Sequence, residues 1–509
     1  MRGAVVAAGA VVVGAGPTGL ALACGLRAAG VSVRLIDRAE RPATSSRALG
    51  LQPRGAEVLD RLGALGGLPE RSVRVKEVVT HVNGELLARL RADRPATSVR
   101  PVLITSQAEV EAGLRRRLRE LGGDVEWGKE LLAADQDAHG ITARLSGEVV
   151  RAEWLIGCDG AHSRVRRLAG IAFPGAPVAE GFLLADVRAE LPLPRDVVST
   201  WLRKDEMFGI FPLPGDDLWR LVASSPEGGV GAEQDFAVLT RLLRDRSGIA
   251  PPAAPEPLWT SAFRAQRRLA TDYRRGRFLL AGDAAHVHSP FGGQGMNTGL
   301  GDAENLAWKL ALVMSGRAGE RLLDTYGAER RPVAREVVAM TSGATRLLVS
   351  PSAPAQAVRD HALVPLLNRQ RVQRLLWEKT SQLGVGYRGG PLAGRSPVRF
   401  AAAVPRAGDR VPDVLCNGPD GTRTRLYAAL GGTWALVAPA GTASTFVEAA
   451  RRHLGGADAV VALTFSADGR KIMLVRPDGH LGWSGGSSAS LESWLARAVA
   501  GGRPRTPFR

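Results

Sequence analysis

The chain has 509 residues, which is too long for one ordinary core and predicts two or three domains. It carries a formal charge of +17, yet its basic residues are scattered along amphipathic segments, which argues against a nucleic-acid partner. Glycine interrupts every apolar run before it reaches the roughly 18 residues that a membrane span needs. A soluble, cytoplasmic protein with no membrane partner is therefore expected.

Three cysteines, Cys24, Cys158 and Cys416, lie far apart and lack the CxxC or CxxH spacing of redox and metal sites. No disulfide framework and no metal site is predicted, and a reducing compartment is expected. The N-terminal apolar stretch contains the glycine pattern of a nucleotide-binding loop, which argues against an export signal.

The first chemical motif is a G-x-G-x-x-G turn between a predicted strand at 11–13 and a predicted helix at 20–29. Gly14 permits the tight turn, Gly16 lets the backbone approach a diphosphate, and Gly19 lets helix and strand pack closely. The helix start supplies free N–H groups and the positive end of the helix dipole.

A second strand is predicted at 31–37 and ends at Asp37, whose carboxylate can accept hydrogen bonds from ribose hydroxyls. Strand, turn, helix and acid together predict dinucleotide binding. They do not separate FAD from NAD, because both contain ADP.

A later motif runs from Gly282 to Asn297 and again follows an apolar run. Asp283 stands at the predicted strand end, where a carboxylate can hydrogen-bond to sugar-like hydroxyls. The glycine loop that follows feeds a helix start, which suits a ring that becomes anionic on reduction.

These residues resemble the second flavin motif of the FAD-dependent aromatic hydroxylases, the para-hydroxybenzoate hydroxylase group. The segment 157–163, Gly-Cys-Asp-Gly-Ala-His-Ser, is similar to the Asp-Gly motif of that family, which is tied to FAD and to nicotinamide use. Segments 45–48, 326–332 and 381–388 also follow the family pattern. The three motifs in this order make the resemblance specific, and it is closest to the aromatic polyketide hydroxylases that carry a thioredoxin-like tail.

The resemblance implies a role for several residues. Asp283 would bind the ribityl chain, and Pro290 would lie beside the isoalloxazine. Arg47 would contact the flavin and move with it, so Arg47 and Pro290 are the residues expected to position the flavin. The complete set of implied FAD contacts is Gly14, Gly16, Pro17, Thr18, Gly19, Asp37, Arg38, Arg47, Gln107, Asp159, Asp283, Pro290, Gly293, Gly295, Met296 and Asn297.

Some roles stay open. Asp159 could cap the following helix instead of serving the cofactor, and His286 could pack beneath the flavin loop or transfer a proton. Ser289 and Phe291 depart from the residues usual in the family, which affects the substrate side. The residues expected on that side are Phe208, Phe211, Pro212 and Phe291, with a plain core role as the alternative.

The implied fold is α/β, with a Rossmann-like FAD-binding domain, an interleaved and mostly antiparallel substrate sheet, and a C-terminal thioredoxin-like α/β domain. The FAD domain is predicted at 1–75, 100–172 and 275–395, and the substrate domain at 76–99 and 173–274. The C-terminal domain is predicted at 405–509, with a packing or oligomerisation role and a homodimer as the assembly to test.

The expected activity is that of an NAD(P)H- and O2-dependent monooxygenase with non-covalent FAD and NADPH or NADH as co-substrate. It would hydroxylate a phenolic or quinonoid polycyclic natural product through a C4a-hydroperoxyflavin, so no protein acid or base is assigned. The alternatives are a Baeyer–Villiger oxidation, oxidative inactivation of an antibiotic, and a basic binding protein that keeps FAD as a structural element.

Overall fold

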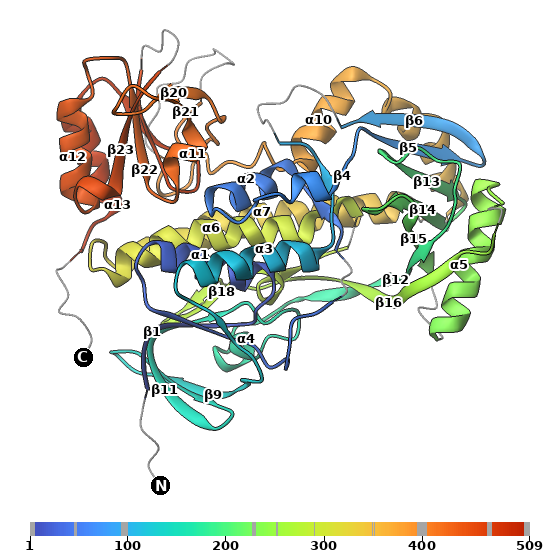
Figure 1. Cartoon of the computed structure of the whole chain (residues 1–509), viewed down its shortest axis with the longest axis horizontal. Coiled ribbons are helices and arrows are strands. Elements are labelled where there is room, and N and C mark those ends of the chain that lie inside the picture. The colour runs from blue at the N-terminus through green and yellow to red at the C-terminus, as the bar shows by residue number, and fades with distance from the viewer. Residues whose placement is uncertain are drawn as a thin grey trace.

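The computed structural model has three large sheets with helices packed around them (Figure 1). The described residues are 6–44, 48–92, 100–225, 231–250, 253–289, 291–348, 350, 352–393, 405–465 and 471–502. Within these ranges, no helix combines the length and apolar character needed to cross a bilayer.

The first sheet is mainly parallel. β1 (Val6–Val13) lies between β2 (Val33–Ile36) and β11 (Glu148–Gly157), and residues 10–12 of β1 are fully buried, as expected of a strand covered on both faces. β18 (Phe278–Leu280) continues the parallel order beyond β11. The other strands of this sheet are β8 (Val125–Glu126), β9 (Leu131–Gln136), β10 (Ile141–Leu145) and β17 (Arg274–Arg275).

Helix α1 (Pro17–Ala28) connects β1 to β2 and begins earlier than the sequence analysis predicts, because Pro17 has the φ angle that a first helical turn requires. The helix is followed by Gly30, which adopts a φ of +77°. Helix α3 (Gln107–Glu120) starts after Ser106, whose side chain accepts a hydrogen bond in the first turn. The predicted strand–helix–strand unit is thus confirmed.

The second sheet is antiparallel except where β13 pairs with β5, and its order is β19-β16-β12-β15-β14-β13-β5-β6. Helix α5 (Ala232–Ser247) covers one face and shares a hydrophobic cluster with it. The strands are β5 (Glu77–Val82), β6 (Glu85–Arg91), β12 (Gly175–Arg188), β13 (Val197–Arg203), β14 (Glu206–Pro212), β15 (Leu218–Ser225), β16 (Glu256–Leu269) and β19 (His286–Val287).

Long helices run through the middle of the molecule, and α6 and α7 lie side by side there (Figure 1). A small sheet of β3 (Gly50–Leu51), β7 (Leu103–Ile104) and β4 (Val73–Arg74) lies near the start of α6. The remaining helices of this part are α2 (Pro53–Arg61), α4 (Arg164–Leu168), α6 (Gln294–Met314), α7 (Arg321–Leu348), α8 (Ala353–Val358), α9 (Val364–Leu366) and α10 (Gln370–Thr380).

The C-terminal unit has its own sheet in the order β21-β20-β23-β22-β24-β25. Two of its strands, β20 and β21, have only three residues each. The elements are β20 (Leu415–Asn417), β21 (Arg423–Arg425), α11 (Leu426–Leu430), β22 (Trp434–Ala438), α12 (Ser444–Leu454), β23 (Val460–Phe465), β24 (Ile472–Val475), β25 (Leu481–Gly485) and α13 (Ser488–Ala498).

Candidate functional site

The three predicted motifs follow three neighbouring parallel strands. Val13 at the end of β1 is in register with Gly157 at the end of β11, and Gly157 is in register with Leu280 at the end of β18. The Cys158 N–H donates to the Val13 carbonyl at 2.8 Å, and the Ala281 N–H donates to the Gly157 carbonyl at 2.9 Å. Motifs far apart in the chain therefore begin at one edge of one sheet, where α/β folds bind ligands.

The glycines of the first motif have the separate roles that the pattern predicts. Gly14 has a φ of +103°, and a Cβ there would lie 2.4 Å from the Cys158 carbonyl oxygen. A Cβ on Gly19 would lie 1.9 Å from the Gly14 carbonyl oxygen. A Cβ on Gly16 would meet no atom within 4 Å, so open space adjoins the start of α1. This space fits the diphosphate of a dinucleotide.

Thr18 joins the first motif to the last. A Cβ on Gly282 would lie 2.6 Å from Thr18 Oγ1, and a Cβ on Gly299 of α6 would lie 2.2 Å from the same atom. The first turn of α1 is therefore in direct contact with the Gly282 turn and with the helix that follows it.

Asp37 lies at the end of β2 and is half-buried. Its carboxylate accepts hydrogen bonds from the Ala15 N–H at 2.7 Å and the Ala39 N–H at 2.8 Å. Asp37 thus stabilises the glycine turn, and it lies where a ribose contact is expected from the sequence. Arg38 beside it is exposed.

Asp283 follows β18 and is exposed, whereas Gly282 and Ala284 on either side are buried. Desolvation by the surrounding protein raises the pKa of Asp283, and nearby His286 opposes this effect. A reachable carboxylate surrounded by protein suits an acceptor for ligand hydroxyls, as the motif predicts.

The flavin loop, residues 291–297, consists of the turn before α6 and the first turn of that helix, and it contains two glycines, Gly292 and Gly293, with φ of +76° and +61°. The Asn297 side chain faces the protein, since its Oδ1 accepts from the Gln52 N–H at 2.9 Å and its Nδ2 donates to the Gly50 carbonyl at 2.9 Å. The Asn297 side chain therefore fixes the loop, which leaves only its backbone to serve a ligand.

Asp302 on α6 forms hydrogen bonds that join the Gly282 turn to α6 and α7. It accepts hydrogen bonds from the Gly282 N–H at 3.1 Å, from Arg330 Nε at 2.7 Å and from His286 Nε2 at 2.6 Å. His286 is 1% exposed. Its position matches the packing alternative of the sequence analysis.

His288 has a fixed tautomer, because Nδ1 donates to the Ser289 carbonyl at 2.8 Å. Among the described residues, its buried Nε2 has no hydrogen-bond partner. Burial is the main cause that lowers the pKa of His288 to about 4. The imidazole is therefore neutral at pH 7.

A pH dependence follows from this shift. The unfolded chain takes up the proton near pH 6.5 and the folded protein only near pH 4, so stability falls as the pH drops through this window. In the His288→Asn variant, the free energy of unfolding should fall over this window by up to about 3 kcal/mol less than in the wild-type protein. Urea unfolding of both proteins between pH 4 and 7 measures it, and parallel curves would contradict the assignment.

Asp159 shows the geometry of its alternative role. Its Oδ2 accepts hydrogen bonds from the Arg164 N–H at 2.6 Å and the Val165 N–H at 3.1 Å, at the start of α4. Gln107 is the first residue of α3 and donates to Glu111 Oε1 at 2.8 Å. Neither contact excludes a role toward the cofactor, which stays a prediction.

Two predicted flavin-positioning residues, Arg47 and Pro290, lie outside the described residues. Phe291 lies in the short 3-10 helix Phe291–Gly293, and its side chain also lies outside the described part.

The positions of Phe208 and Pro212 match the core alternative, and their role on the substrate side stays a prediction. Phe208 is buried in the cluster beneath α5, and Pro212 is opposite Trp219 of the same cluster. Residues along a strand alternate between faces, so Phe211 points to the opposite face, away from α5. That face also carries Arg220, which is opposite Phe211 and forms a buried ion pair with Asp186.

Arg220 is not among the residues predicted from the sequence, although the sequence contains one signal of its buried ion pair. An arginine at an inward position of an apolar strand requires a partner when buried. The structure supplies it in the two hydrogen bonds to Asp186, at 2.6 and 2.8 Å.

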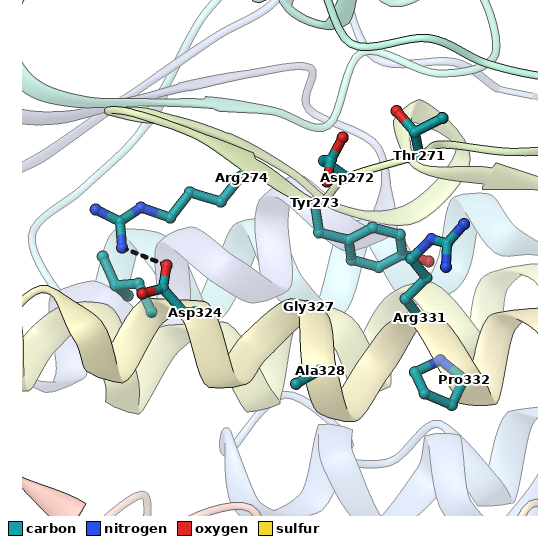
Figure 2. A pocket seen from close by; sticks show the side chains of 10 residues that line it. Thr271, Asp272, Tyr273, Arg274, Asp324, Gly327, Ala328, Arg331 and Pro332 are labelled. Atoms are coloured by element: carbon teal, nitrogen blue, oxygen red, sulfur yellow. Dashed lines mark hydrogen bonds and ion pairs between the residues drawn. The ribbon is translucent and has the colours of Figure 1, made fainter. Parts of the chain in front are cut away.

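A pocket of about 370 Å³ lies between α7 and the turn after β16 (Figure 2). Arg274 and Asp324 form an ion pair at its edge, and Arg331 and Pro332 line it from α7. No residue of the three motifs lines it. It therefore lies apart from the predicted cofactor site.

A Rossmann-type sheet with three motifs at one edge, beside an antiparallel sheet, defines the class of dinucleotide-dependent oxidoreductases. The residues present fit FAD, because Gly16 leaves room for a diphosphate and Asp283 is reachable. Residues 7–341 match the FAD binding domain family, and residues 404–502 match the aromatic-ring hydroxylase C-terminal family. The chain belongs to the FAD-binding aromatic-ring hydroxylases and is an FAD-dependent monooxygenase.

The relatives agree with this assignment over nearly the whole chain. A rifampicin monooxygenase from Streptomyces venezuelae is 35% identical over 96% of this chain and 99% of its own length. A 6-methylpretetramide 4-monooxygenase from Streptomyces rimosus is 39% identical over 75% of this chain and 70% of its own. The OxyS anhydrotetracycline hydroxylase structure from Streptomyces rimosus has a TM-score of 0.79 and 30% identity, and covers 98% of this chain and 100% of its own.

Proposed function

We propose that this monooxygenase hydroxylates a phenolic or quinonoid polycyclic compound, with NAD(P)H and O2 as co-substrates. FAD supplies the redox chemistry, and the residues named in the three motifs hold it. The single observation that carries the substrate class is an apolar, aromatic cluster beside the flavin loop.

This cluster extends from the flavin loop to the face of the second sheet that lies opposite α5. Leu49 directly precedes Gly50, whose Cα would lie 3.5 Å from a Cβ on Gly293. Phe211, Leu213 and Trp377 pack against the cluster. An apolar surface that includes two aromatic rings suits contact with a flat, multi-ring substrate.

Trp377 lies on α10, about one turn before the point at which this helix contacts the flavin loop. Gln294 Nε2 donates to the Thr380 carbonyl at 2.9 Å, which ties the end of α10 to the start of α6, one turn beyond Trp377. Within the described part of the chain, the buried Trp377 Nε1 has no acceptor. A quinone or phenol oxygen of the substrate could take this N–H.

We expect replacement of Trp377 by alanine to raise the substrate KM about 10-fold while the FAD affinity stays unchanged, since about 1.4 kcal/mol of binding is lost. Phenylalanine should restore part of the loss by keeping the ring. Leu375 is 60% exposed on the same helix, so its alanine variant is the control. An unchanged KM for Trp377→Ala would contradict the role.

The function itself is tested with purified protein reconstituted with FAD. Polycyclic phenols should stimulate NAD(P)H oxidation, and the product should contain one additional oxygen atom with its rings intact. If no compound of a broad panel stimulates oxidation, the substrate proposal fails.

The similarity to a rifampicin monooxygenase favours a second candidate function. In this candidate the enzyme oxidises an antibiotic, and the oxidation protects the cell. A Baeyer–Villiger reaction would insert the oxygen beside a carbonyl and expand or open a ring. Product analysis and the antibiotic tolerance of a host that carries the gene separate these candidates.

We also propose the domain ranges given by the sequence, with the FAD domain at 1–75, 100–172 and 275–395. The substrate domain is at 76–99 and 173–274, and the C-terminal domain is at 405–509. The FAD-contact residues of the three motifs, a cytoplasmic location and a homodimer likewise remain proposals.

A further inference from the structure

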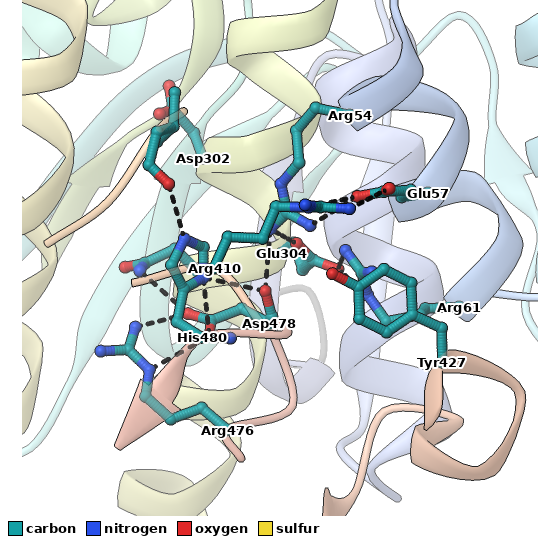
Figure 3. A network of polar contacts seen from close by, with 12 residues as sticks. Arg54, Glu57, Arg61, Asp302, Glu304, Arg410, Tyr427, Arg476, Asp478 and His480 are labelled. Carbon is teal, nitrogen blue, oxygen red and sulfur yellow. Dashed lines mark hydrogen bonds and ion pairs between the residues drawn. The ribbon is translucent and has the colours of Figure 1, made fainter. Parts of the chain in front are cut away.

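We propose that the turn at 476–480 in the C-terminal unit positions the FAD site, so that this unit has a role in cofactor binding beyond packing. The turn inserts buried charged side chains among α2, α6 and α7 (Figure 3). All three helices carry or fix residues of the flavin loop. The inference depends on the FAD cofactor and not on the proposed substrate.

Asp478 is the centre of these contacts and is 1% exposed. Its Oδ2 accepts hydrogen bonds from Asn305 Nδ2 at 3.2 Å and from Trp308 Nε1 at 3.1 Å, both on α6. The flavin loop ends in the first turn of α6, so Asp478 fixes the rotation and position of the helix that presents the loop.

Arg476 extends the contact to α7. Its guanidinium donates to both carboxylate oxygens of Glu329, at 2.7 and 2.8 Å, and also pairs with Asp478. The next residue on α7, Arg330, donates to Asp302, which holds the Gly282 N–H of the last motif. These contacts connect Arg476 through α7 and Asp302 to the turn that contains Asp283.

The backbone of Asp478 reaches α2. Arg54 donates to the Asp478 carbonyl at 2.8 Å and to Glu304 of α6 at 2.9 Å. The residue before α2, Gln52, donates its N–H to the Asn297 side chain in the flavin loop. A Cβ on Gly55 would lie 2.1 Å from Asn297 Oδ1, so α2 cannot shift without moving the loop.

The charges make this arrangement rigid. Burial alone would raise the pKa of Asp478 and Glu329, but Arg476 holds both below their ordinary values, with Glu329 at about 2. All these groups are ionised at pH 7. The removal of one charge leaves a partner buried without compensation, so the helices must rearrange.

Apolar side chains of the C-terminal unit and of α6 also pack together next to Asp478. Trp308 of α6 meets Trp434 of β22 edge to face, with ring centroids 5.3 Å apart. The C-terminal unit therefore shares a core with the FAD-binding part, and its turn cannot be regarded as a surface attachment.

The test measures FAD binding by the apoprotein through quenching of flavin fluorescence. We expect Asp478→Asn to raise the FAD Kd at least 10-fold at a temperature at which circular dichroism shows the apoprotein folded. Arg476→Lys, which keeps the charge but loses the paired geometry, should have an intermediate effect. Glu492→Gln, in the exposed pair with Arg452 of the same unit, should bind FAD normally.

Trp308→Phe is a milder variant that removes only one donor to Asp478, and it serves if Asp478→Asn does not fold. We expect it to raise the Kd about 3-fold and to shift the visible spectrum of the bound flavin. Variants that are less stable but bind FAD with unchanged affinity and spectrum would overturn the proposal. A failure to hydroxylate polycyclic phenols would concern only the proposed substrate.

Discussion

Replacement of Gly16 by alanine is expected to weaken FAD binding about 100-fold, equal to about 2.7 kcal/mol, while the apoprotein keeps its stability. A Cβ on Gly16 meets no protein atom within 4 Å, and its φ of −72° suits alanine. The new methyl group would instead occupy the space that adjoins the start of α1. Isothermal titration of the apoprotein with FAD, together with its thermal midpoint, measures both effects.

Two variants frame this result. Gly486 is exposed in the C-terminal unit, and a Cβ there also meets no atom within 4 Å, so Gly486→Ala should change neither quantity. Gly19→Ala should destabilise even the apoprotein, because its Cβ would overlap the Gly14 carbonyl. Normal FAD affinity in Gly16→Ala would show that the diphosphate does not lie at this turn.

Replacement of Asp302 by asparagine is expected to lower the free energy of unfolding of the apoprotein by about 3–5 kcal/mol, because Arg330 would remain buried without its charge partner. Burial opposes ionisation of Asp302, but His286 and Arg330 hold its pKa below the ordinary value. Asparagine has only one acceptor oxygen, so either the Gly282 N–H or Arg330 Nε would lose its acceptor, and FAD retention should also fall. Urea unfolding and the flavin content of the purified protein measure the two losses.

The control for this variant is Asp217→Asn. Asp217 forms an exposed ion pair with Arg188, and the loss of such a pair costs under about 1 kcal/mol. If Asp302→Asn lowered the free energy of unfolding no more than the control does, a stabilising ion pair between Asp302 and Arg330 would be excluded.

The glycine pattern and the strand-end carboxylates could be recognised in the sequence because each depends on local geometry. Gly14 needs a positive φ, Gly19 needs a close approach, and Asp37 and Asp283 end apolar strands. The resemblance then supplied the cofactor and the order of the sheets. Phe208 shows what such reasoning leaves open, because an aromatic residue in a strand does not disclose which face of the sheet a later helix covers.

The dinucleotide unit, the flavin family and the α/β class could be predicted from the residues alone, since these follow from short-range spacing and from motifs whose chemistry is local. The three-dimensional contacts were needed to show which face of the second sheet α5 covers and that Asp302 accepts from the Gly282 N–H. They were also needed to show that Asp478 reaches α2 and α6. Those contacts join residues far apart in the chain. A buried charge finds its partner in space, and no periodicity along the sequence records the choice.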